Sequence, residues 1–195
     1  MLQLLLRLVL CLGMSAGAAA APRVPADESE VLEKLSLMRD SPKAAALRGL
    51  RDRVAAAPAD PGPAAALARR YFGLAMADGD PRYVGYAQAA LQRWGDADAP
   101  PGILVARAML RQYRHDFDGA LADLARALQR DPGYAEAHAW RAAIFMVRAD
   151  YAQAAAACAA LTALEDSLQA VGCGAYVEAT TGRADRLGDA AAADG

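Results

Sequence analysis

The chain has 195 residues and a formal net charge of −2, and 55% of its residues are hydrophobic. This length is sufficient for one domain with a buried core. The arginines are interleaved with aspartates and glutamates rather than grouped, which argues against a nucleic-acid-binding surface. Alanine makes up about a quarter of the residues and aromatic residues only 6%, so the composition favours closely packed helices over a β-sheet.

The N-terminal segment 1–21 has the features of a secretory signal. The apolar stretch from Leu2 to Leu12 is shorter than a membrane-spanning helix requires, and it leads to a run of alanines that ends at Ala21. Signal peptidase accepts small residues of this kind before a polar segment. We therefore expect cleavage after Ala20 or Ala21 and a periplasmic location for the mature protein. Retention of the segment as a membrane anchor and acylation of Cys11 as a lipoprotein are the alternatives.

The next segments are a predicted linker and two predicted helices. Residues 22–28 contain two prolines and show no periodicity, which is typical of an extended linker. Helices are expected from Ser29 to Arg39 and from Pro42 to Ala57, where Pro42 stands at a position suited to a helix start. We interpret residues 29–61 as N-terminal capping helices for the part of the chain that follows.

Internal repetition at one fixed spacing dominates the remainder of the chain. Residues that recur at this spacing are Ala108 and Ala142, Asp116 and Asp150, Phe117 and Tyr151, and Ala120 and Ala154. An upstream copy has Gly73 in its first helix and Ala87 in its second, and a partial fourth copy starts near Leu168. A constant period of about 34 residues is the mark of a repeat architecture.

The repeats resemble the tetratricopeptide repeat, or TPR. The segment from His115 to Pro132 matches the second helix of that family, with an aromatic residue at Phe117, a small residue at Ala120 and the closing proline. The resemblance implies an all-α fold over residues 62–195, a right-handed superhelical array of about 3 to 3.5 antiparallel helix pairs. In such an array the small residues let neighbouring helices approach closely.

Two arginines depart from the family pattern. Arg107 and Arg141 stand where many relatives have a core leucine. Because the stem of an arginine is apolar, we expect each stem to lie on the helix surface and each guanidinium to reach out to solvent.

Cys158 and Cys173 are the two cysteines that remain after the predicted cleavage. They lie on consecutive predicted helices, eight residues before and seven residues after a turn near Asp166, so they are nearly equidistant from that turn. Residues so placed in an antiparallel helix pair lie side by side, which favours a disulfide in an exported chain. Two free buried thiols are the alternative.

No catalytic motif is present. The sequence lacks Gly-x-Ser-x-Gly, a glycine-rich phosphate loop and His-Glu-x-x-His. His115 falls in a predicted turn, and His138 has no partners at metal-ligand spacing beyond Cys158. We therefore expect neither an enzyme nor a bound metal or cofactor.

The resemblance implies that a protein or peptide partner lies on the concave face formed by the first helices. The lining residues carried over from the family are Arg70, Leu74, Val105, Met109, Gln112, Tyr113, Ala139, Met146, Val147 and Tyr176. This lining is mostly apolar, so an apolar or helical segment is the expected ligand. For Met109 and Met146, packing between adjacent repeats is an equal alternative. The sequence thus predicts a non-catalytic scaffold of the bacterial envelope, or alternatively an accessory subunit bound permanently in a larger complex.

Overall fold

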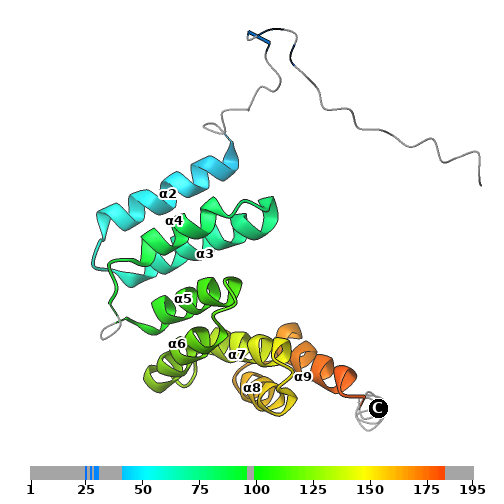
Figure 1. Cartoon of the computed structure of the whole chain (residues 1–195). Coiled ribbons are helices and arrows are strands. Elements are labelled where there is room, and N and C mark those ends of the chain that lie inside the picture. The colour runs from blue at the N-terminus through cyan, green and yellow to red at the C-terminus, as the bar shows by residue number, and fades with distance from the viewer. Residues whose placement is uncertain (1–24, 26, 28, 31–40, 96–98, 183–195) are drawn as a thin grey trace, which may run out of the picture. The chain divides into compact units, whose positions relative to one another are not determined.

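The computed structural model describes residues 25, 27, 29, 30, 41–95 and 99–182 (Figure 1). The chain divides into two units, Met1–Met38 and Arg39–Gly195. In the first unit, the carboxylate of Asp27 accepts hydrogen bonds from the backbone amide and the hydroxyl of Ser29, at 2.7 and 2.5 Å. The predicted signal, most of the linker and most of the helix predicted from Ser29 lie outside the described residues, so these assignments stay predictions.

Every regular element among the described residues of the second unit is an α-helix, which confirms the predicted all-α class. The helices are α2 (Pro42–Ala56), α3 (Pro61–Asp78), α4 (Arg82–Leu91), α5 (Pro101–Tyr113), α6 (Phe117–Arg130), α7 (Ala135–Val147), α8 (Tyr151–Leu164) and α9 (Leu168–Thr180). Within the described part of the chain, no helix has both the length and the apolar character that crossing a membrane requires.

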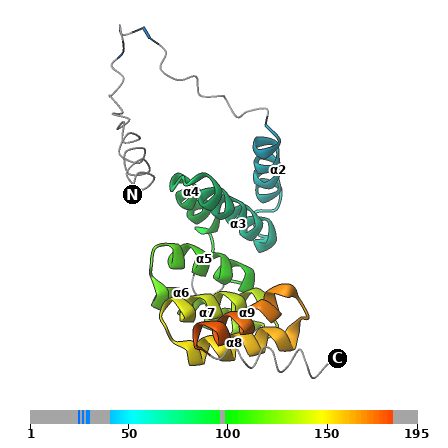
Figure 2. The same ribbon diagram turned by 90° about the vertical axis from the view of Figure 1, so that its right-hand side faces the viewer.

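The helices form consecutive hairpins. Helix α3 packs against α4, α5 against α6, and α7 against α8, and the first helices of neighbouring hairpins also touch (Figures 1 and 2). The start of α7 follows the start of α5 by one sequence period, and the start of α8 follows that of α6 by the same interval. The predicted period is therefore a structural period, in which each copy is one helical hairpin.

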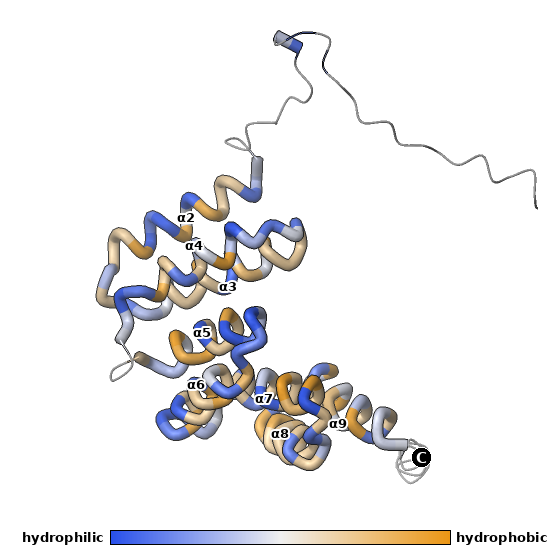
Figure 3. Tube along the Cα trace, in the orientation of Figure 1, coloured by the Kyte–Doolittle hydropathy of each residue, from blue (hydrophilic) through white to orange (hydrophobic). Residues whose placement is uncertain are grey.

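Helix α2 lies at the start of this row and packs on α3. Its bounds agree with the prediction to within one residue. Ser41 caps its N-terminus by accepting a hydrogen bond from the amide of Ala44 at 3.1 Å, and Pro42 occupies the first turn, where no amide donor is needed. Leu47 is the buried residue of the helix. The arginines and the lysine of α2 give it several hydrophilic positions, whereas α8 is mostly apolar (Figure 3).

The turns within the second and third hairpins have the same backbone conformation. His115 and Ala149, which occupy the same place in successive copies, both have positive φ, at 60° and 57°. In each turn the amide of that residue and the amide of the next residue bond back to carbonyls of the last helical turn, which is the Schellman arrangement. The following aspartate, Asp116 or Asp150, then caps the second helix. Glycine takes the positive-φ position at Gly79, after α3.

Small residues occupy the helix crossings, as the sequence predicted. Ala108, Ala120, Ala142 and Ala154 are each exposed to 2% or less. An alanine at such a crossing lets two helix axes approach more closely than a leucine would allow. The core formed in this way extends from α2 to α7, and a second cluster links α7, α8 and α9.

Candidate functional site

An open apolar groove runs between α7 and α9, with α8 beneath it. Its volume is about 480 Å³. The residues that line it are Ala139, Ala142, Ala143, Met146, Val147, Cys158, Leu161, Gln169, Gly172, Cys173, Tyr176 and Thr180. None of these side chains carries a charge at neutral pH. The groove therefore suits an apolar occupant.

The walls and the floor of the groove differ in exposure. Val147 on α7 and Tyr176 on α9 are 63% and 64% exposed, which is unusual for residues of this size. Cys158 and Leu161 of α8 are buried and form the floor. Small residues, such as Gly172, leave room between the walls for the backbone of a ligand to come close.

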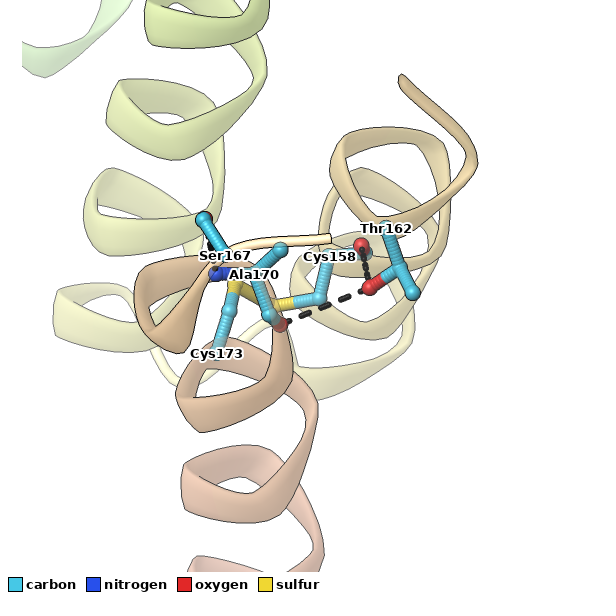
Figure 4. Close-up of a disulfide and its surroundings, with 5 residues drawn as sticks. All are labelled: Cys158, Thr162, Ser167, Ala170 and Cys173. Carbon is cyan, nitrogen blue, oxygen red and sulfur yellow. Dashed lines mark hydrogen bonds between the residues drawn. A yellow bond between two sulfur atoms is a disulfide. The ribbon is translucent and has the colours of Figure 1, made fainter. Parts of the chain in front are cut away.

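Cys158 and Cys173 are joined by a disulfide at the floor of the groove (Figure 4). Their Cα atoms are 5.4 Å apart, within the usual range for a bridge between packed helices. The hydroxyl of Thr162 lies 3.0 Å from the carbonyl oxygen of Cys158 and 3.4 Å from that of Ala170, so it also links α8 to α9. The cysteine pair that the sequence favoured for a disulfide is thus brought together, and the bridge holds one wall of the groove to its floor.

The structure brings four of the ten predicted binding residues into this groove, namely Ala139, Met146, Val147 and Tyr176. Three others are corrected by their burial. Leu74, Val105 and Met109 are only 4%, 0% and 7% exposed, so they pack in the core and do not line an open surface. Met109 belongs to the buried core cluster that extends from α2 to α7. The remaining three, Arg70, Gln112 and Tyr113, lie on α3 and α5, away from the groove.

An aromatic cluster lies between α3, α5 and α7. The ring of Phe72 on α3 meets Tyr113 of α5 and Trp140 of α7 edge to face, both with centroids 6.1 Å apart. Phe72 is 9% exposed. These aromatic contacts join the first helices of three hairpins.

Arg69, on α3, forms a polar link to the start of α7. Its guanidinium donates two hydrogen bonds to the carboxylate of Glu136 at the start of α7, at 3.1 and 2.7 Å, and a third to the hydroxyl of Tyr134 at 3.2 Å. Burial alone would lower the pKa of Arg69, but the hydrogen bonds and the charge of Glu136 outweigh it, so the pKa lies above its ordinary value. The guanidinium is held in its charged form.

Asp123 is a buried charged residue that the sequence reasoning missed. Its exposure is 0%, and it lies in the middle of α6. Arg107 donates two hydrogen bonds to its carboxylate, at 2.8 and 2.7 Å, so the expectation that this guanidinium reaches out to solvent is wrong. Attraction to a buried carboxylate outweighs hydration of the cation here. The spacing of Asp123 with Ala120 and Ala127, on one helical face, was the available signal.

No group of three or more histidine, cysteine, aspartate or glutamate residues that could hold a metal ion occurs within the described ranges. His138, on α7, lies with its Nε2 atom 3.1 Å from the carbonyl oxygen of Pro132. His115 is in the turn before α6, edge to face with the ring of Phe117 at 5.6 Å. Both histidines therefore have local structural partners.

The fold is similar to the crystal structure of a thermophilic TPR protein of Thermus thermophilus. The TM-score is 0.55 and the sequences are 21% identical, and the match covers 73% of this chain and 76% of that chain. No family model matches the sequence, and no curated protein matches it. At this identity the likeness concerns the fold. Taken with helical hairpins that recur at a constant interval, it shows that this chain has the fold of the tetratricopeptide-repeat proteins.

Proposed function

We propose that the protein is a non-catalytic scaffold of the bacterial envelope, which holds an apolar helical segment of a partner protein in the groove between α7 and α9. The observation that carries this proposal is the groove itself, about 480 Å³ in volume and lined without a charged side chain. Stacked helical hairpins create curved surfaces that proteins with this architecture use for binding.

The shape of the groove favours a helix over an extended strand. Two neighbouring helices present ridges with a trough between them, into which the ridge of a third helix packs. An extended peptide would also bring a row of unpaired backbone amides and carbonyls. The groove walls are helices whose own backbone groups are already bonded, so they offer these groups few partners. A helix needs no partners for its backbone, and only its apolar face has to match the trough.

The proposed envelope location rests on the N-terminal segment Met1 to Ala21 and on the disulfide. A disulfide persists in an oxidising compartment such as the periplasm. N-terminal sequencing of the protein from a cell-envelope fraction tests this part. We expect a mature chain that begins near Ala21, and an intact Met1 in the cytoplasmic fraction would contradict it.

Site-specific photocrosslinking tests the groove. A benzophenone amino acid placed at Ala143, on the groove wall, should crosslink to one partner protein in envelope extract. Mass spectrometry should then place the crosslink on an amphipathic helical segment of that partner. Val147→Glu should abolish the crosslink, because a charged group would be buried without a partner in the complex.

Met76→Glu is the matched control for this experiment. Met76 is an apolar residue of α3 that is 55% exposed, so the substitution makes the same chemical change away from the groove. The crosslink at Ala143 should persist in this variant. Equal crosslinking in Val147→Glu and the wild-type protein, or a crosslink only to a second copy of the chain, would contradict the proposal.

A permanently bound accessory subunit is the second candidate, and the opposite side of α8 and α9 favours it. Val171, 56% exposed, lines a second cavity of about 680 Å³ between α8 and α9, and Leu164 and Leu168, at the end of α8 and the start of α9, are 45% and 89% exposed. Large apolar residues in such numbers mark interaction surfaces. Loss of partner capture in Leu168→Glu, with capture retained in Val147→Glu, would favour this second function.

A further inference from the structure

A third pocket lies between the end of α4 and α5, and it shares no residue with the apolar groove. Its volume is about 380 Å³. Gln88, Gln92 and Trp94 line one side, and Arg107, Arg111 and Arg114 line the other. Asp116 also lines the pocket, so three arginines and one aspartate give it a net positive charge, whereas the groove is neutral.

The carboxylate of Asp123, beneath this pocket, has no capacity left for further donors. It accepts two hydrogen bonds from Arg107, and it also pairs with Arg126 and, at 3.1 Å, with Nε of Arg111. A carboxylate offers about four lone-pair sites, and these four donors fill them. The outer guanidinium nitrogens of Arg111, whose side chain is 34% exposed, are therefore available to an anion in the pocket.

The polar groups around Arg111 and Arg114 do not balance their charges. The nearest other carboxylate to Arg111 among the described residues belongs to Asp116, at 3.7 Å, beyond hydrogen-bonding distance and with its side chain 54% exposed. Arg114 donates to the neutral amide oxygen of Gln88, at 2.5 Å. Arg111 is thus paired with the buried Asp123 and, more loosely, with Asp116, whereas Arg114 has a neutral partner and no ion pair with a carboxylate of the described residues.

We propose that this pocket binds an oxyanion, and specifically the carboxylate of an acidic peptide side chain. Arg111, in the last turn of α5, and Arg114, the residue that caps this helix, both line the pocket, so two guanidinium groups can bind the same anion. The ring of Trp94 offers a flat apolar wall for the methylene groups of a glutamate. Because the pocket lies apart from the groove, the proposal does not depend on the function proposed above.

Nuclear magnetic resonance of the two indole N–H groups tests the proposal. The chain has two tryptophans, Trp94 in the pocket and Trp140 in the aromatic cluster with Phe72, and a Trp140→Phe variant assigns them. The probe is an acetylated, amidated peptide of alternating glycine and glutamate, with glutamine in place of glutamate as its control. Only the signal of Trp94 should move, and only with the glutamate peptide.

Two variants that each remove one positive charge distinguish binding in the pocket from general electrostatic attraction of the peptide to the protein. Arg114→Gln removes one guanidinium from the pocket without touching Asp123, and it should weaken peptide binding by about tenfold. Arg93→Gln, an exposed position outside the pocket, should change binding less than about twofold. Far-ultraviolet circular dichroism should show that both variants are folded.

A measurement with inorganic phosphate tests whether the oxyanion bound in the pocket is a peptide carboxylate or a phosphate. It should displace the glutamate peptide at high concentration, because it carries the same chemistry. A shift of Trp94 with phosphate and none with the glutamate peptide would overturn the assignment to a peptide. No shift with either probe, or equal weakening by Arg93→Gln and Arg114→Gln, would overturn the pocket as an oxyanion site.

Discussion

Arg107 and Asp123 join the two helices of one hairpin through two hydrogen bonds, at 2.8 and 2.7 Å, and the carboxylate is fully buried. Replacing Arg107 with methionine keeps the apolar stem but removes two of the four donors to that carboxylate. A buried charge left with fewer partners is destabilising. Because Arg111 and Arg126 remain, we expect Arg107→Met to lower the free energy of unfolding by about 2 kcal/mol in urea denaturation.

Arg141→Met is the control for this change. Arg141 is at the equivalent position one repeat later, where Ala157 stands in place of the aspartate, and its guanidinium lies 5.6 Å from the ring centroid of Phe145. Its replacement should cost less than about 1 kcal/mol. Equal losses in the two variants would show that the buried carboxylate is not the cause.

Ala149→Gly should stabilise the protein. Alanine at φ of 57° is in the left-handed region, which costs a residue with a side chain about 1–2 kcal/mol. Glycine relieves this strain but loses more entropy on folding, so the expected net gain is about 0.5–1 kcal/mol in thermal or urea unfolding. Ala156→Gly, at an exposed position inside α8, should instead cost about 0.5–1 kcal/mol. A loss in both variants would argue against strain at Ala149.

Ala154→Leu should overpack the crossing between α7 and α8. Ala154 is 0% exposed, so three added carbon atoms find no space without displacement of a helix. The expected loss is about 1–3 kcal/mol in the free energy of unfolding. Ala152→Leu, an exposed position on the same helix, should change stability by less than about 0.5 kcal/mol. An unchanged melting temperature in Ala154→Leu would contradict the close approach of these helices.

Reduction of the disulfide should weaken the attachment of α9 to α8. The bridge closes a loop between residues 15 apart, which in the chain-entropy model contributes about 3 kcal/mol. Titration of unfolded, non-reduced protein should find no free thiol at Cys158 or Cys173, and a reductant should lower the melting temperature. The double variant Cys158→Ala and Cys173→Ala provides the control, because a reductant should leave its melting temperature unchanged. Two free thiols in protein isolated from the cell envelope would contradict the presence of this disulfide.

The sequence was sufficient for the helical hairpins because their determinants are local and periodic. The small residues at Ala108 and Ala142 and the turns before Asp116 and Asp150 recur at a fixed spacing, and each copy builds one hairpin. The binding surface was predicted less well, because it depends on contacts between different repeats. The burial of Val105 and the contacts of Phe72 with Tyr113 and Trp140 depend on how closely three first helices pack, and no pattern within one repeat reports that distance.

The Arg69–Glu136 ion pair and the contact of Phe72 with Trp140 connect the first hairpin directly to the third. In many repeat arrays each repeat contacts only its immediate neighbours, so the terminal repeats can unfold independently of the central ones. Here the first and third hairpins, which are not adjacent in the chain, are joined by side-chain contacts. The segment from α3 to α7 should consequently lose its structure in one cooperative transition, whereas α9, beyond these contacts, opens at a lower free energy. Hydrogen exchange of the backbone amides would display the two levels separately.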